Sequence, residues 1–251
     1  MALDINSVSK KFDKQIVLDN ISLQIPEGSI LGLLGRNGIG KSTLINSMID
    51  LLPLDSGTIS YDGKSLIEDE LEVKRNLGIV GEQNQLVEEF SGINYLNFVG
   101  ELYKVPSSEL KSRIESLVSF FFTDKDVLKK RISSYSTGMK KLIGVCAAVL
   151  HTPKYLLMDE PFSGLDAVAT QKLVQFIKNY QNGDRVILIS SHILYHLEKV
   201  ATDIAVLNEG KIVYHNSLDA FTSEGKAELD KALLDLLVVE DVQMDDLSWI
   251  Q

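Results

Sequence analysis

Short apolar runs alternate along the chain with longer stretches in which apolar residues recur every three or four positions. The first pattern predicts strands and the second predicts helices, and their alternation is typical of an α/β protein with a mostly parallel sheet. The predicted strands are Gln15–Leu18, Ser29–Leu34, Thr58–Tyr61, Leu77–Val80, Tyr155–Met158, Arg185–Ile189 and Ile204–Leu207.

Two of these strands, over residues 30–34 and 155–158, are apolar at nearly every position, which predicts burial on both faces of the sheet. Ile16–Ile25 alternates more loosely and ends at the turn residues Pro26, Glu27 and Gly28. This segment is therefore predicted to be part of an antiparallel β flap.

Between residues 92 and 150 the strand pattern is replaced by helical periodicity. Asn94–Tyr103, Ser107–Phe122 and Ser136–Leu150 are predicted helices, so an all-helical insert (92–150) interrupts an α/β core of residues 1–91 and 151–218. Three consecutive aromatic residues, Phe120–Phe122, either form part of a docking surface or pack in the insert's own core.

The composition indicates a globular protein of cytosolic type. The chain has 251 residues, 45% of them hydrophobic, and its one cysteine, Cys146, excludes an intrachain disulfide and is expected in the core. No signal peptide is recognisable after Met1. The longest apolar stretch, residues 142–150, is far shorter than the roughly 18 residues of a membrane helix.

The formal net charge of -10 argues against a nucleic-acid partner, which basic surfaces usually bind. Most of this charge lies in residues 219–251, which hold nine acidic residues and two lysines. Within this tail Leu229, Leu233, Leu236 and Leu237 follow helical spacing. The tail is therefore predicted to be an acidic helix that packs on its own domain or docks on a partner subunit.

A glycine-rich loop follows the strand at residues 29–34 and precedes an apolar-periodic helix. It fits the pattern G-x-x-x-x-G-K-[ST] of phosphate-binding loops. Backbone amides of such a loop surround phosphate oxygens, Lys41 would reach the β- and γ-phosphates, and the Ser42 hydroxyl would ligate Mg²⁺. The predicted nucleotide-binding residues here are Gly35, Arg36, Asn37, Gly38, Ile39, Gly40, Lys41, Ser42 and Thr43.

Two carboxylates, Asp159 and Glu160, follow the buried strand at residues 155–158. In open α/β sheets ligands bind at the carboxyl ends of the strands. Asp159 could hold Mg²⁺ through water, and Glu160 could act as general base on an attacking water. This pair therefore supports the prediction that the glycine-rich loop binds phosphate groups.

These motifs resemble those of the nucleotide-binding subunits of ATP-binding cassette (ABC) transporters, over residues 3–213. Three further segments support the resemblance in the family's order. Tyr135–Met139 resembles the signature, Ser163–Asp166 resembles the D-loop, and His192 stands where the family has its switch histidine. The resemblance implies the P-loop ABC ATPase fold and ATP and Mg²⁺ as ligands.

The resemblance also implies roles for residues that no single pattern assigns. Ser136, Thr137, Gly138 and Met139 would contact the γ-phosphate of the ATP bound to a second subunit in a head-to-tail homodimer or heterodimer. His192 would be catalytic beside Glu160, Asp166 would belong to the D-loop, and Phe12 would stack on adenine.

The chain departs from the family pattern in two places. Where the family has the Q-loop glutamine, Glu82 stands with Gln83 beside it, and either residue could ligate Mg²⁺. The signature has the Ser-x-Gly-Met form, which resembles that of ABC-2-type exporter subunits.

The predicted function is therefore an ATP-hydrolysing subunit that drives a separate integral membrane permease, in the direction of export, and is peripheral to the cytoplasmic face of the membrane. Two alternatives remain: a soluble ABC ATPase that is not coupled to transport, and a module that senses ATP without hydrolysing it.

Overall fold

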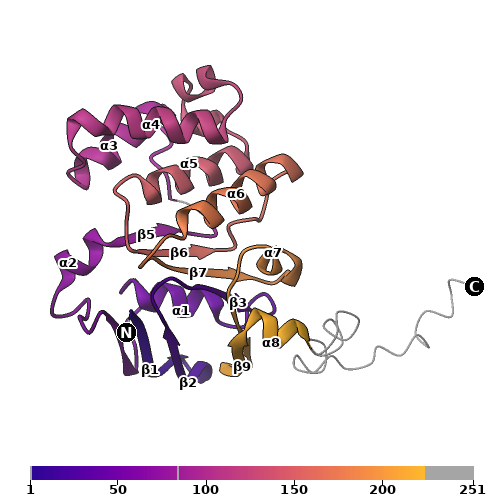
Figure 1. Cartoon of the computed structure of the whole chain (residues 1–251). Coiled ribbons are helices and arrows are strands. Elements are labelled where there is room, and N and C mark those ends of the chain that lie inside the picture. The colour runs from indigo at the N-terminus through magenta and orange to yellow at the C-terminus, as the bar shows by residue number, and fades with distance from the viewer. Residues whose placement is uncertain (1, 84, 224–251) are drawn as a thin grey trace, which may run out of the picture.

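The computed structural model describes residues 2–83 and 85–223 (Figure 1). Their strands form two sheets: an antiparallel three-stranded sheet in the order β2-β1-β4, and a six-stranded sheet in the order β5-β6-β7-β3-β8-β9. The smaller sheet contains β1 (Leu3–Phe12), β2 (Gln15–Ile25) and β4 (Ser56–Tyr61). The larger contains β3 (Ile30–Leu34), β5 (Leu77–Val80), β6 (Tyr155–Asp159), β7 (Val186–Ser191), β8 (Asp203–Asn208) and β9 (Lys211–Ser217).

Neighbouring strands of the six-stranded sheet are parallel except for the last pair, β8 and β9. In Figure 1, α1 (Lys41–Met48) and the three-stranded sheet lie on one side of it. Four helices, α3 (Gly92–Leu102), α4 (Ser107–Phe121), α5 (Thr137–Val149) and α6 (Ala167–Tyr180), lie on the other. The remaining helices are α2 (Glu70–Arg75), α7 (Leu194–Glu198), α8 (Leu218–Ser223) and the two 3-10 helices η1 (Lys125–Lys129) and η2 (Ile132–Ser134).

The central strands are apolar throughout because a separate core covers each face of the sheet. In β3, Ile30 and Leu34 pack in the core shared with α3–α6, whereas Leu31 and Leu33 pack in the core shared with α1, β1 and β2. Strand side chains alternate between faces, so a strand buried on both sides needs an apolar residue at every position. The expectation of two-sided burial for β3 and β6 is confirmed.

The seven predicted strands are all present, and the three predicted helices of residues 92–150 agree with α3, α4 and α5 to within two residues at each end. The antiparallel flap is confirmed by the pairing of β2 with β1. The pattern did not predict β1 itself. Its alternation is broken by register shifts and by Ser7, whose φ of 51° lies in the left-handed region.

Two other expectations concern individual side chains. Cys146 is buried, and this burial raises the pKa of its thiol far above the ordinary value. Phe121 and Phe122 are buried, and Phe120 packs against the same core, which favours the core interpretation of the aromatic run over the docking surface.

The predicted acidic tail lies almost wholly outside the described residues, so its helical stripe and its partner are not addressed by the structure. Its first residues form the end of α8, where Phe221 is buried against Tyr214 with ring centroids 4.9 Å apart. Within the described ranges no helix is both long and apolar enough to cross a membrane.

The two-sided core gives a stability prediction. Leu188 of β7 is fully buried, so Leu188→Ala should lower the free energy of unfolding by about 2–5 kcal/mol, through lost burial and the cavity that remains. Leu71→Ala is the matched control: Leu71 is 71% exposed on α2, and its change should stay within about 0.5 kcal/mol. Chemical denaturation measures both, and equal losses would contradict the described core.

Candidate functional site

The phosphate-binding loop connects β3, at the centre of the sheet, to the N-terminus of α1. Gly38 and Gly40 have φ values of 78° and 117°, a region that other residues rarely adopt. A Cβ atom on Gly40 would lie 3.0 Å from the Val17 carbonyl oxygen of β2. The glycines thus allow the loop to turn tightly beneath β2, and no side chain caps the helix that follows, so its first amides can receive an anion.

Lys41, the first residue of α1, is only 5% exposed. Its ammonium donates hydrogen bonds to the carbonyl oxygens of Gly35 (2.7 Å) and Arg36 (3.2 Å) and lies 3.4 Å from Glu160 Oε1. A buried ammonium is costly unless it is paired and hydrogen-bonded. These contacts hold the cation directly over the loop.

Asp159 ends β6, and Glu160 follows it with an unusual backbone. Glu160 has a φ of 46°, and a left-handed conformation costs a non-glycine residue about 1–2 kcal/mol. The Ser190 hydroxyl of β7 stabilises this geometry, because it accepts a hydrogen bond from the Glu160 amide (3.0 Å) and donates one to Asp159 Oδ1. Backbone strain of this kind recurs at active sites, and here it sets the direction in which the Glu160 side chain leaves the strand.

His192 directly follows β7, and its Nδ1 lies 3.0 Å from Glu160 Oε1. Strands β3, β7 and β6 are consecutive neighbours in the parallel sheet, so their carboxyl ends meet at one edge. The structure thereby brings Lys41, Glu160 and His192 together, although the three are distant in sequence. A carboxylate between an ammonium and an imidazole can accept a proton from water.

The signature residues stand at the start of α5. Ser136 caps this helix by accepting a hydrogen bond from the Met139 amide (3.2 Å). A Cβ on Gly138 would lie 3.0 Å from the Gly164 carbonyl oxygen, so the signature and the D-loop are packed together. Within the described chain no hydrogen bond or ion pair joins residues 136–139 to residues 35–43 of the same subunit.

The remaining predicted residues lie on the surface. Phe12 ends β1 with 44% of its surface exposed, and the Lys10 ammonium lies 5.6 Å from the centre of its ring. Asp166 caps α6 by accepting a hydrogen bond from the Ala169 amide (2.8 Å). Glu82 and Gln83 are both exposed, just beyond the end of β5.

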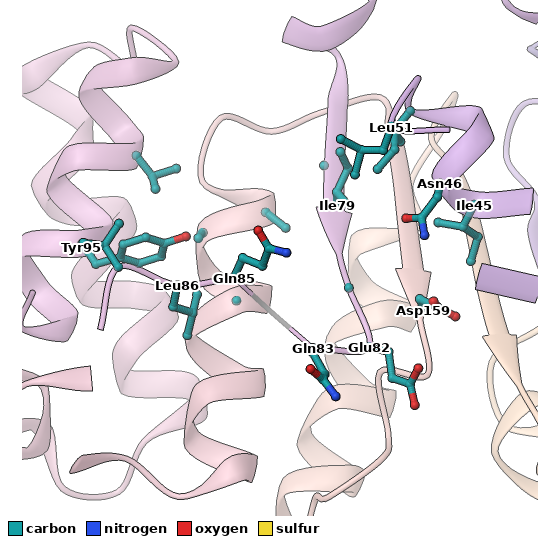
Figure 2. Close-up of a pocket in the computed structure, with 18 of the residues that line it drawn as sticks. Ile45, Asn46, Leu51, Ile79, Glu82, Gln83, Gln85, Leu86, Tyr95 and Asp159 are labelled. Atoms are coloured by element: carbon teal, nitrogen blue, oxygen red, sulfur yellow. The ribbon is translucent and has the colours of Figure 1, made fainter. Parts of the chain in front are cut away.

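A cleft of about 700 Å³ runs from this site to the helical segment (Figure 2). Ser42, Asp159, Glu82 and Gln83 line it on the nucleotide side. Leu51 and Ile79 lie on the side of the sheet, and Tyr95 faces them from α3, as Figure 2 shows. The cleft therefore joins the predicted Mg²⁺ ligands to an apolar surface between the two parts of the chain.

The oxygen ligands that line this cleft fit Mg²⁺. Ser42 offers a hydroxyl and Asp159 and Glu82 offer carboxylates, the hard oxygen donors that this cation prefers. Across residues 2–83 and 85–223, no three His, Cys, Asp or Glu side chains form a metal site by themselves. The arrangement suits a cation that completes its coordination with phosphate oxygens and water.

Two residues that contact the site were missed from the sequence: Ser190, which binds the Asp159 carboxylate and the Glu160 amide, and Lys141 of α5. Lys141 is 3% exposed and donates hydrogen bonds to the carbonyl oxygens of Gly81 (3.0 Å) and Glu82 (2.7 Å). Its burial lowers the pKa of its ammonium, against the opposing effect of nearby carboxylates. The sequence feature that could have identified Lys141 is its position directly before the longest apolar stretch, residues 142–150.

A second titratable group, His196, lies on α7 near His192. Burial is the main reason why the pKa of His196 is lowered, and the positive charge of Lys199 adds to the effect. His196 therefore favours its neutral form, and its ring packs against Phe162 with centroids 4.8 Å apart.

Comparison with known proteins places this site in a family. The family model described as "ABC transporter" matches residues 18–163. The ABC transporter ATP-binding protein NatA of Bacillus subtilis (strain 168) is 30% identical over 94% of this chain and 98% of its own length. The bacitracin transport ATP-binding protein BcrA of Enterococcus faecalis is 32% identical over 84% of this chain and 68% of its own length.

Solved structures support the same family assignment. One described as the ATP binding subunit of an ABC transporter superposes with a TM-score of 0.84 at 27% identity, over 94% of this chain and 99% of that one. A dimeric ATP-binding cassette bound to ADP and Pi shares the fold, with a TM-score of 0.77 at 20% identity over 86% of this chain and 98% of its own. The chain therefore belongs to the ABC transporter family, as one of its ATP-binding and ATP-hydrolysing subunits.

Proposed function

We propose that this subunit powers a membrane exporter by closing and reopening a head-to-tail dimer on ATP. The observation that carries the proposal is the contact of Glu160 with both Lys41 and His192 at the edge of the sheet. This cluster pairs a cation suited to phosphate with a carboxylate suited to activating water.

Each residue of the cluster has a role in that reaction. Lys41 exchanges its contacts with the carbonyls of its own loop for phosphate oxygens, and the amides of residues 35–43 surround the same group. Glu160 accepts a proton from the attacking water. His192, when both ring nitrogens carry a proton, holds the carboxylate through Nδ1–H and donates a hydrogen bond from Nε2–H to the γ-phosphate. Phe12, at the exposed end of β1, stacks on the adenine ring.

Ser42 and Asp159 are the residues that would hold Mg²⁺, with Glu82 in preference to Gln83 as the third ligand from the loop after β5. Bound there, Mg²⁺ would neutralise the phosphate charge that develops as the bond to the γ-phosphoryl group breaks. All three side chains line the same cleft.

The signature supports the dimer. Residues 136–139 lie at the N-terminal end of α5, and most of them are small. Within the described chain they make no hydrogen bond to residues 35–43. The N-terminal end of α5 therefore binds the phosphate of a second subunit. A head-to-tail pair, of identical or different subunits, places that end on the partner's γ-phosphate. The D-loop around Asp166 is packed beside it and would follow the same movement.

The cleft supports a membrane partner. Its apolar half, between α3 and the sheet, would receive a segment of a separate permease and transmit the closure of the dimer to it. The bacitracin transport relative supports transport as the outcome, and the Ser-x-Gly-Met signature supports export. The subunit would then work at the cytoplasmic face of the membrane, and its negative charge disfavours nucleic acid as an alternative partner.

Removal of the Lys41 ammonium tests the phosphate site. Lys41→Ala should weaken ATP binding by about 100-fold or more, because charge-assisted hydrogen bonds contribute roughly 1.5–3 kcal/mol each. Fluorescence titration with a nucleotide analogue measures the affinity. Lys111→Ala, on the exposed surface of α4, is the control, and unchanged affinity in Lys41→Ala would remove Lys41 from the phosphate site.

Neutralising Glu160 separates binding from hydrolysis. Glu160→Gln should retain ATP binding, lose at least about 100-fold of the ATPase rate expected of a general base, and accumulate as a dimer with ATP. Phosphate release and size-exclusion chromatography report the two effects, with exposed Glu115→Gln as control. Turnover at the wild-type rate would mean that a different group activates water.

A third substitution tests the departure from the family pattern. Glu82→Gln should keep ATPase activity within about tenfold, roughly 1.4 kcal/mol of barrier, because an amide oxygen can replace the carboxylate as a ligand. A larger loss would show that the carboxylate itself is needed. If Gln83→Ala lowers the rate and Glu82→Ala does not, the ligand is Gln83.

A further inference from the structure

Lys141 is a buried cation that the proposed reaction does not use directly. It lies in the first half of α5, as the first of nine consecutive buried residues of this helix. Lysine is almost never fully buried unless its ammonium is paired, since transfer of the charge out of water is costly. Its position therefore requires a reason that packing alone does not supply.

The acceptors of Lys141 lie just beyond the carboxyl end of β5. Its Nζ donates to the carbonyl oxygens of both Gly81 and Glu82, at 3.0 and 2.7 Å. β5 is a four-residue strand at the edge of the sheet, paired with β6. The strand that precedes Glu82 is thus short, and Lys141 fixes the chain just beyond the end of this strand.

The same helix packs closely on β5. A Cβ on Gly78 would lie 2.3 Å from the Ala148 carbonyl oxygen, so the glycine lets the backbone of α5 approach the strand. Farther along the loop, Lys140 makes an ion pair with Glu88 (2.6 Å), and the Ser133 amide donates to the Glu88 carbonyl oxygen (3.0 Å). The loop after β5 is therefore attached to the signature helix and the segment before it.

Charge adds a second constraint. The carboxylates of Asp159, Glu82 and Glu160 all stabilise the charged form of Lys141, although burial lowers the pKa of its ammonium overall. A cation at this place offsets repulsion among carboxylates that surround the proposed Mg²⁺ position. This offset of repulsion matters more in this chain, because the carboxylate of Glu82 stands where the family has the neutral amide of a glutamine.

The geometry points to Lys141 as a positioning residue that holds Glu82 in place to ligate Mg²⁺ and ties this ligand to the signature helix. This inference rests on the proposed function and extends it. Contact of Glu82 with Mg²⁺ and displacement of α5 would then be coupled, since one side chain joins the two elements. Removal of Lys141 should impair the use of Mg²⁺ and leave the phosphate loop intact.

The test is a double-mutant cycle on the full-length chain, with ATP affinity measured with and without Mg²⁺. Lys141→Met and Glu82→Ala should each reduce the Mg²⁺-dependent gain in affinity by about fivefold or more, and the double variant should lose no more than either single one. Affinity without Mg²⁺ should stay within about twofold, because Lys41 is unchanged. Lys111→Met, on the exposed surface of α4, is the matched control and should resemble the wild type.

Two outcomes would overturn the inference: a wild-type Mg²⁺ effect in Lys141→Met, or losses that multiply in the double variant, as expected of independent structural damage. Thermal unfolding checks the fold of each variant. If Lys141→Met does not fold, Lys141→Gln, which keeps an amide donor, enters the same cycle. If neither folds, Lys141 serves stability alone and the inference is wrong.

Failure of the proposed function would be recognised separately. In that case the wild type itself would bind ATP no better than Lys41→Ala, with or without Mg²⁺. If the wild type binds and Lys41→Ala does not, while Lys141→Met matches the wild type, only the role of Lys141 has failed.

Discussion

A lysine ammonium in a protein interior must be surrounded by acceptors, and in this chain the nucleotide site is organised around Lys41. Two carbonyl oxygens of its own loop and the Glu160 carboxylate receive it. These partners come from two separate places: the loop after β3 and the end of β6. Their meeting depends on the parallel sheet, which aligns the carboxyl ends of neighbouring strands, and on the two cores that fix the sheet from either side.

The same edge of the sheet carries backbone strain that the surrounding hydrogen bonds offset. Glu160 adopts a left-handed conformation, and Ser190 binds both its amide and the side chain of Asp159. Because Ser190 and His192 follow one another closely at the end of β7, one strand orients both carboxylates. This arrangement aims Glu160 at Lys41 and His192 instead of leaving it to solvent.

One departure from the family pattern, Glu82, lies beside a buried cation. Glu82 introduces a carboxylate where the family has an amide, and the buried Lys141 supplies a cation close to it. Both belong to the junction between β5 and the signature helix, which also borders the cleft proposed for the permease. The residue that departs from the family pattern therefore lies at the border of the cleft that is proposed to receive the permease.

Local sequence determined much of this protein. The apolar runs of β3 and β6 predicted that these strands are buried on both faces of the sheet. The helical periodicity between residues 92 and 150 predicted α3, α4 and α5. Both patterns can be read from residues that are close together in the sequence. The phosphate-binding loop was recognisable for the same reason. β1 was not, since bulges and the left-handed Ser7 break its alternation.

Only the tertiary structure decided which of these segments meet. Glu160 contacts Lys41 and His192, Ser190 binds Asp159 and Glu160, and Lys141 binds the carbonyls of Gly81 and Glu82. These contacts join residues that are 30 to 119 positions apart in the sequence. Strand order and helix packing set such distances, and no local pattern encodes them, because they follow from how the whole chain buries its apolar faces.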